Sequence, residues 1–150
     1  MDKSKVVDVL NDLITKLYDG EKGYKEAAED VDSPTLKNMF KDFAQQRYDF
    51  GHELKAAIKQ AGGEVDKGGS VAAAVHRTWI DLKSAIAGND EAAVLNECKR
   101  GEENALKEYD EALSQLNSTD PGYNVVSKQR TQIQQALSQV EQQISVYETK

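Results

Sequence analysis

The sequence is poor in the residues that interrupt helices, form disulfides or bind transition metals. Its single cysteine, Cys98, cannot form a disulfide within the chain, which fits a reducing compartment. Its two prolines, Pro34 and Pro121, leave long stretches in which nothing breaks a helix. Its two histidines, His52 and His76, supply few of the imidazoles that most often bind metals. The sequence therefore favours a helical, disulfide-free protein.

The chain also lacks an excess of basic residues and any long apolar run. It has 26 acidic and 19 basic residues in 150, which gives a net charge of −7. This balance argues against a nucleic-acid partner and against binding to anionic membranes. No apolar run approaches the roughly 20 residues that cross a bilayer, and the segment MDKSKVVDVLNDL does not resemble a signal peptide. We expect a soluble cytoplasmic protein with neither a nucleic-acid nor a membrane partner.

Apolar residues recur at three- and four-residue spacing, which is typical of helices and not of strands. Ser33-Pro34 and Asp120-Pro121 each predict a helix start, with the polar side chain as cap and proline at the first helical position. The glycine-containing segments 62–69 and 88–90 predict breaks. The expected helices cover residues 6–28, 34–61, 71–87 and 91–116, and the segment after Pro121.

Four long helices and one short helix predict an all-α fold. Short turns make the first pair and the last pair antiparallel hairpins, and the segment 62–88, which contains the short helix, supplies the crossover between them. This is the plan of ferritin-like up-down four-helix bundles. We expect residues 1–150 to form a single domain of this kind.

Each long helix carries one polar residue on or beside its apolar stripe. Two of them belong to an internal echo, because DGEKGYKEAAED and RGEENALKEYDE each contain a glutamate directly after glycine. A buried charge without a partner costs several kcal/mol, so these residues must pair or bind something. The four residues are Glu21, Arg47, Glu102 and Gln129. We expect a buried polar network in which Arg47 binds the carboxylates and the hydroxyls of Tyr24 and Tyr109 complete the hydrogen bonds.

A metal site is the alternative explanation of the same residues. Ferritin-like di-metal proteins use one glutamate on each of two helices and a Glu-x-x-His motif on each of the others. Glu21 and Glu102 fit the first half of this rule, and His76 could be recruited. The second half fails, because the last helix has no histidine, and Asp49 and His52 point away from the stripe of their helix. In this alternative the cofactor is iron or manganese, whereas the polar network needs no cofactor.

Three further features have structural interpretations. Trp79 of the HRTW segment is expected to close the open side of the bundle, and Cys98 is expected to be a buried, unreactive thiol. The last helix is rich in glutamine, and such a face can pack against a second subunit, so a homodimer is possible. No phosphate-binding glycine loop, nucleophile elbow or Ser-His-Asp order is present.

Four segments of the chain resemble a family of small bacterial four-helix-bundle proteins of ferritin-like type, known as domain of unknown function 2383. The segments are LNDLITKLYDGEKGYKEAAED, GHELKAAIKQAGGE, GGSVAAAVHRTWIDLKSAI and LNECKRGEENALKEYDEAL. The resemblance implies a bacterial cytoplasmic protein with a ferritin-like bundle. It implies little about chemistry, because the role of the family is not established. Membership in the ferritin-like class would suggest a metal, but the absence of the Glu-x-x-His ligands argues against oxidase or iron-storage activity. The sequence therefore predicts a non-enzymatic structural or interaction protein, with the degenerate di-metal carboxylate protein as the alternative.

Overall fold

The computed structural model describes residues 3–65, 77–88 and 90–148, and most of these residues are helical. The described residues form no strand. The helices are α1 (Lys3–Asp30), α2 (Pro34–Gln60), α3 (Arg77–Ala87), α4 (Glu91–Gln115) and α5 (Tyr123–Glu148). The predicted all-α fold, with four long helices and a short one between the second and third, is confirmed.

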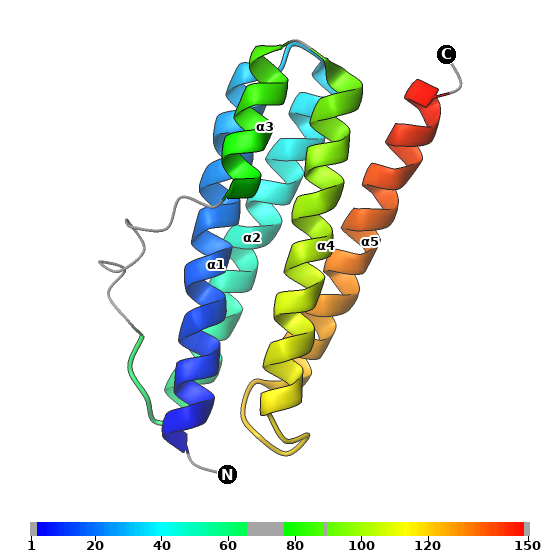
Figure 1. Cartoon of the computed structure of the whole chain (residues 1–150). Coiled ribbons are helices and arrows are strands. Elements are labelled where there is room, and N and C mark those ends of the chain that lie inside the picture. Colours follow the sequence, from blue (N-terminus) through cyan, green and yellow to red (C-terminus); the bar gives the residue numbers. More distant parts are fainter. Residues whose placement is uncertain (1–2, 66–76, 89, 149–150) are drawn as a thin grey trace.

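The four long helices form a bundle of two antiparallel hairpins. α1 and α2 form the first hairpin, and α4 and α5 form the second, while α1 packs against α4 and α2 packs against α5 (Figure 1). The short helix α3 lies against α1 and α4 and leads into the second hairpin. This is the predicted order of hairpin, crossover and hairpin.

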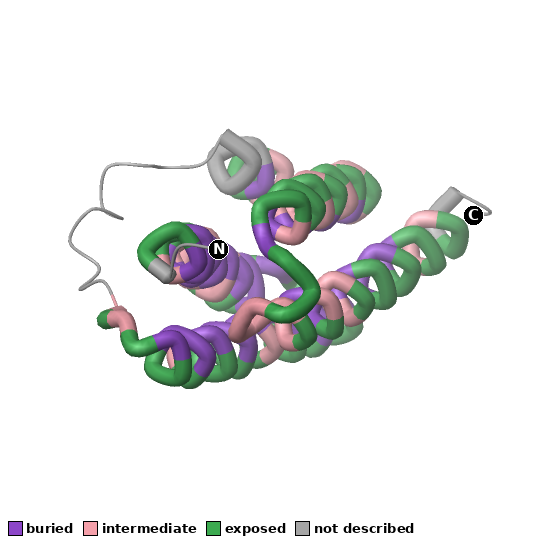
Figure 2. The backbone as a smooth tube through the Cα atoms, turned by 90° about the horizontal axis from the view of Figure 1, so that it is seen from below, coloured by how far each residue is buried: buried purple, intermediate pink, exposed green. Residues whose placement is uncertain are grey.

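The buried residues face the space between the long helices, as the view along the bundle shows (Figure 2). They form two clusters, one at each end of the bundle. The first contains Leu10, Leu54, Ile58 and Ile133, and the second contains Phe40, Phe43 and Leu95 among others. Tyr24 belongs to the second cluster and Tyr109 to the first, so the region where the clusters meet is lined by tyrosines.

The ends of α2 follow the predicted signals. Ser33 caps its start by accepting a hydrogen bond from the Leu36 N–H at 3.3 Å, and Pro34 is the first helical residue. At the other end Gly62 has a φ of 77°. The N–H groups of Gly62 and Gly63 donate to the carbonyls of Lys59 and Ile58, each at 3.0 Å. This pair of bonds is a Schellman motif, which a residue with positive φ makes possible.

The predicted start of the last helix is wrong. α5 begins at Tyr123, so Pro121 precedes the helix and Asp120 does not cap it. The Asp120 carboxylate accepts a hydrogen bond from the Asn117 N–H at 2.7 Å, which closes a turn before the helix. Gly122 follows with a φ of 88°, outside the helical region, so the helix cannot begin before it.

Two other expectations fall partly on residues that the structure does not describe. The short helix was predicted over residues 71–87, and its described part covers Arg77–Ala87. His76 lies outside the described residues, and so does the side chain of Trp79. Before α4, Asp90 caps the start of the helix, with its Oδ1 accepting a hydrogen bond from the Ala93 N–H at 3.2 Å.

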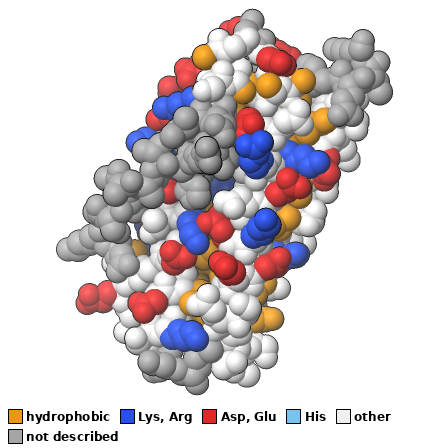
Figure 3. All heavy atoms as spheres, in the orientation of Figure 1, with side chains coloured by type: hydrophobic (Ala, Val, Ile, Leu, Met, Phe, Trp, Pro, Cys, Tyr) orange, Lys and Arg blue, Asp and Glu red, His pale blue; other side chains and the backbone are white. Residues whose placement is uncertain are grey.

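Acidic and basic side chains are interspersed over the face of the molecule in Figure 3. Lys16 of α1, for example, lies 2.9 Å from Asp12 on its own helix and 3.2 Å from Glu108 on α4. Burial alone would lower the pKa of Lys16, but the two carboxylates raise it overall. Lys16 and Glu108 are half-buried, so their ion pair also connects the first hairpin to the second.

Candidate functional site

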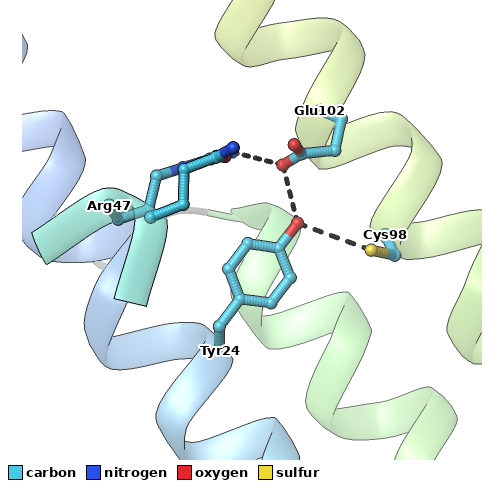
Figure 4. Close-up of polar contacts among 5 residues, drawn as sticks. Tyr24, Arg47, Cys98 and Glu102 are labelled. Atoms are coloured by element: carbon cyan, nitrogen blue, oxygen red, sulfur yellow. Dashed lines mark hydrogen bonds and ion pairs between the residues drawn. The ribbon is translucent and has the colours of Figure 1, made fainter. Parts of the chain in front are cut away.

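The centre of the bundle contains an ion pair between the two hairpins. Arg47 of α2 donates from Nη2 to Oε2 of Glu102 on α4, and the two residues are 4% and 1% exposed. Tyr24 of α1 donates its hydroxyl to the same oxygen at 2.6 Å. In Figure 4 the side chains of Arg47 and Tyr24 both point toward the Glu102 carboxylate. One carboxylate thus connects three of the long helices.

The surroundings of Arg47 fix its position. Its guanidinium lies 5.6 Å from the centre of the Tyr24 ring, a geometry that favours a cation–π interaction. Phe43 packs against the same tyrosine in an edge-to-face arrangement, with 5.3 Å between the ring centres. Gly20 lies against the arginine stem, because a Cβ there would be in van der Waals contact with Arg47 Cγ and Nε at 3.4 Å. Nη1 of Arg47 donates to Gln46 Oε1 at 2.6 Å.

Cys98 extends this set of contacts along α4. Its sulfur lies 3.4 Å from the Tyr24 hydroxyl oxygen. Since the single hydroxyl proton of Tyr24 is donated to Glu102, the thiol must be the donor in the contact with Tyr24. Burial raises the pKa of Cys98 to about 12, and the nearby Glu102 carboxylate adds to the rise. The thiol therefore stays protonated at neutral pH, as expected for an unreactive cysteine.

The tyrosine and the arginine keep their ordinary protonation states here. Burial raises the pKa of Tyr24 well above its usual value of 10.0, so the phenol remains a hydrogen-bond donor. Burial by itself lowers the pKa of Arg47, but the attraction of Glu102 outweighs it and the pKa is raised overall. A permanent cation therefore lies beside Glu102.

Gln129 forms a second polar set one to two helical turns away. Its amide nitrogen donates to the Phe50 carbonyl at 3.2 Å and to Glu53 Oε1 at 3.0 Å. Its amide oxygen accepts from the Tyr109 hydroxyl at 2.7 Å. Gln129 is 0% exposed, and these three bonds connect α5 with α2 and α4. Each of the four long helices therefore contributes side chains to one or both polar sets, which together we call the central polar network.

Glu21 is not part of this network, contrary to the sequence-based expectation. Its carboxylate lies 2.7 Å from Lys25 Nζ, one turn along α1, and faces a hollow on the outer side of α1 and α2. The pair with exposed Lys25 requires little desolvation, whereas burial beside Glu102 would place two carboxylates together. α1 contributes Tyr24 to the network instead.

The sequence analysis missed one buried polar residue. Asn11 is buried on α1, and its amide nitrogen donates to the Glu64 carbonyl at 3.1 Å. The bond connects α1 to the segment that follows α2. Asn11 lies among the apolar residues of the first stripe, and that position is the signal by which it could have been found.

The other side chains considered as metal ligands do not lie together in the structure. His52 is exposed and packs edge-on against Tyr48, and Asp49 accepts a hydrogen bond from Gln45 on the surface. Within residues 3–65, 77–88 and 90–148, no group of three or more His, Cys, Asp or Glu side chains is placed to hold a metal ion. Glu102 Oε1 is nevertheless a buried oxygen for which the described residues provide no hydrogen-bond donor.

The family described as "Domain of unknown function (DUF2383)" has a sequence model that matches residues 5–115. The chain belongs to this family. The match covers α1 to α4 and ends at the last residue of α4, so α5 and its Gln129 lie beyond it. No curated protein matches the chain in sequence. None of the described helices combines the length and hydropathy that a membrane span requires.

Proposed function

We propose that this protein of the DUF2383 family is a non-enzymatic, cytoplasmic bacterial bundle that serves as a structural or interaction protein. The observation that supports the proposal is the pairing of the charged groups at the centre of the bundle. Arg47 and Glu102 are almost completely buried and bind each other. Their role is to hold the hairpins in one arrangement, while the outer surface makes contact with other molecules.

The position of the hollows on the surface supports the same proposal. A catalytic group must reach a substrate, so it normally lines a cleft. Two hollows of the described residues lie in outer grooves, between α1 and α2 and between α1 and α4, and a third lies where α1 ends and α3 meets α4. Arg47, Glu102 and Gln129 line none of these three. This supports a role in stability for the buried polar residues.

A degenerate di-metal carboxylate protein remains the second candidate, because of one observation. Glu102 Oε1 is buried without a hydrogen-bond donor among the described residues, and a carboxylate oxygen in that state could ligate iron or manganese. Two features oppose it: Arg47 is a permanent cation bonded to the other oxygen, and Glu21 is directed elsewhere. The ferritin-like relationship is likewise a proposal, supported by the order of the helices.

Metal content separates the two candidates. The protein would be produced in medium supplemented with iron and manganese, and bound metal would be measured by mass spectrometry. Glu102→Gln keeps the size of the side chain, and Glu103→Gln removes an exposed charge one residue away as the matched control. We expect background metal in all three samples. One or two ions per chain in the wild type and the control, lost in Glu102→Gln, would overturn the proposed function.

The possible homodimer is a specific form of the interaction role. The outer face of α5 carries exposed glutamines, including Gln134, Gln135, Gln139 and Gln142, and neutral amides are easier to bury at an interface than charges. Light scattering after size exclusion would give the mass in solution. Twice the chain mass of 16.6 kDa would support self-association, and 16.6 kDa at every concentration would refute the dimer.

A further inference from the structure

The outer surface between α1 and α2 contains a hollow of about 740 Å³. Its walls are formed by both helices, and it is lined by Ala28 and Ala44, which are buried. These small side chains leave space where larger ones would fill the groove. The volume falls in the range of small-molecule sites, about 300–1,000 Å³.

Two lysines lie on the α2 wall. Lys37 and Lys41 are one turn apart, so their ammonium groups can reach the same point in the groove. Neither has an acidic residue three or four positions away on α2. No ion pair of either is found within the described part of the chain. Two neighbouring ammonium groups repel each other, and an anion bound between them would replace this repulsion with attraction.

The α1 wall carries the opposing charges. Lys25 is neutralised by Glu21 at 2.7 Å, and this pairing raises the pKa of Lys25. Glu29 is exposed, lines the same groove and forms no ion pair with another described residue. Farther along α2, Tyr48 is 46% exposed and can donate its hydroxyl. The α2 wall is therefore positive and carries an exposed hydroxyl. On the α1 wall Glu21 is paired with Lys25, and Glu29 is the carboxylate that opposes the binding of an anion.

We propose that this groove binds a small ligand that carries a phosphate or a similar multiply charged oxyanion, with Lys37 and Lys41 both binding the anionic group. Lysine ammonium groups on flexible stems can converge on such a group and are common phosphate ligands. The net charge of −7 repels anions in general, so binding must come from this local arrangement. The site is independent of the central polar network, and its test is independent of the metal measurement.

The test is a titration of ¹⁵N-labelled protein with inorganic pyrophosphate at constant ionic strength, followed by amide chemical shifts. We expect saturable shifts centred on residues 25–29 and 37–48. Lys37→Gln and Lys41→Gln should each weaken binding about tenfold, since each removes a hydrogen bond to a charged group. Glu29→Gln should strengthen binding, because it removes the opposing carboxylate.

Lys107→Gln is the matched control, because Lys107 is exposed on α4 and has Glu103 and Glu111 one turn away on either side. It makes the same change in net charge outside the groove and should leave the affinity unchanged. Non-saturating shifts, shifts spread over the molecule, or equal losses in Lys107→Gln and in the groove variants would overturn the proposal. Thermal unfolding of each variant would show that the fold is intact.

Discussion

Replacement of Arg47 by methionine is the most direct test of the central polar network. Methionine keeps much of the stem that packs against Gly20 but removes the guanidinium. The Glu102 carboxylate then stays buried, and the Tyr24 hydroxyl is the one donor that the described residues still provide. Removing one partner of a buried pair costs about 3–5 kcal/mol. This is a large part of the 5–15 kcal/mol that is typical of the free energy of unfolding of a domain.

The assay is urea unfolding at pH 7, followed by circular dichroism of the helices. Arg130→Met is the matched control, since Arg130 of α5 pairs with Asp110 of α4 on the surface. Both changes remove an arginine from a pair between helices, and the difference between them is burial. An exposed pair contributes about 0–1 kcal/mol, so the control should unfold at nearly the wild-type urea concentration.

A double variant, Arg47→Met with Glu102→Leu, completes the test. It removes both charges, so the cost of an unpaired buried carboxylate disappears. It still leaves the Tyr24 hydroxyl without its acceptor, which costs about 1–3 kcal/mol. We therefore expect the double variant to be more stable than the sum of the single variants predicts. The reasoning is refuted if Arg47→Met costs no more than Arg130→Met, or if the two single effects simply add.

Two further predictions concern other parts of the bundle. The protein should lose stability above about pH 9, because burial raises the pKa of Cys98 from 9.0 to about 12 and also raises the pKa values of Tyr24 and Tyr109 from 10.0. The folded state then holds protons that the unfolded state has released, so each group lowers the free energy of unfolding by about 1.4 kcal/mol per pH unit above its unfolded pKa. Urea unfolding between pH 8 and about pH 11 measures how steeply the free energy of unfolding falls with pH. Cys98→Ala should reduce this slope, and an unchanged slope would contradict the contribution assigned to the Cys98 thiol. Gly63→Ala should destabilise the fold, because the new Cβ would lie 2.3 Å from Val7 Cγ2; the melting temperature should recover when Val7→Ala is added, and no recovery would rule out the clash.

The fold could be predicted because several independent signals in the sequence indicate the same helix. In α2, for example, the apolar spacing, the Ser33-Pro34 start and the Gly62-Gly63 end all indicate the same helix, and all three are found. The start of α5 was missed because Asp120 has two local uses. Its side chain can cap a following helix or close a turn, and the positive φ of Gly122 decides in favour of the turn.

The central polar network could be predicted only in part. Arg47, Glu102 and Gln129 lie near the centres of their apolar stripes, and the structure places all three in the core. Glu21 lies at the edge of its stripe, where a small rotation of the helix decides between core and surface. Lys25, one turn away, offers Glu21 a partner on the outside. Helical periodicity gives the direction of a side chain to within a fraction of a turn. This is not precise enough to decide whether a residue at the edge of an apolar stripe is buried.

The two polar sets also determine how the helices align along the bundle axis. Glu102 and Tyr109 are seven residues apart on α4, which is about 10 Å along a helix. Sliding one hairpin past the other by a helical turn, about 5.4 Å, would separate Arg47 from Glu102 and Gln129 from the Phe50 carbonyl at once. Apolar side chains could find new contacts after such a shift, but the buried charge and amide could not. The alternative alignments are therefore raised in free energy by the same few groups that contribute least to the hydrophobic core.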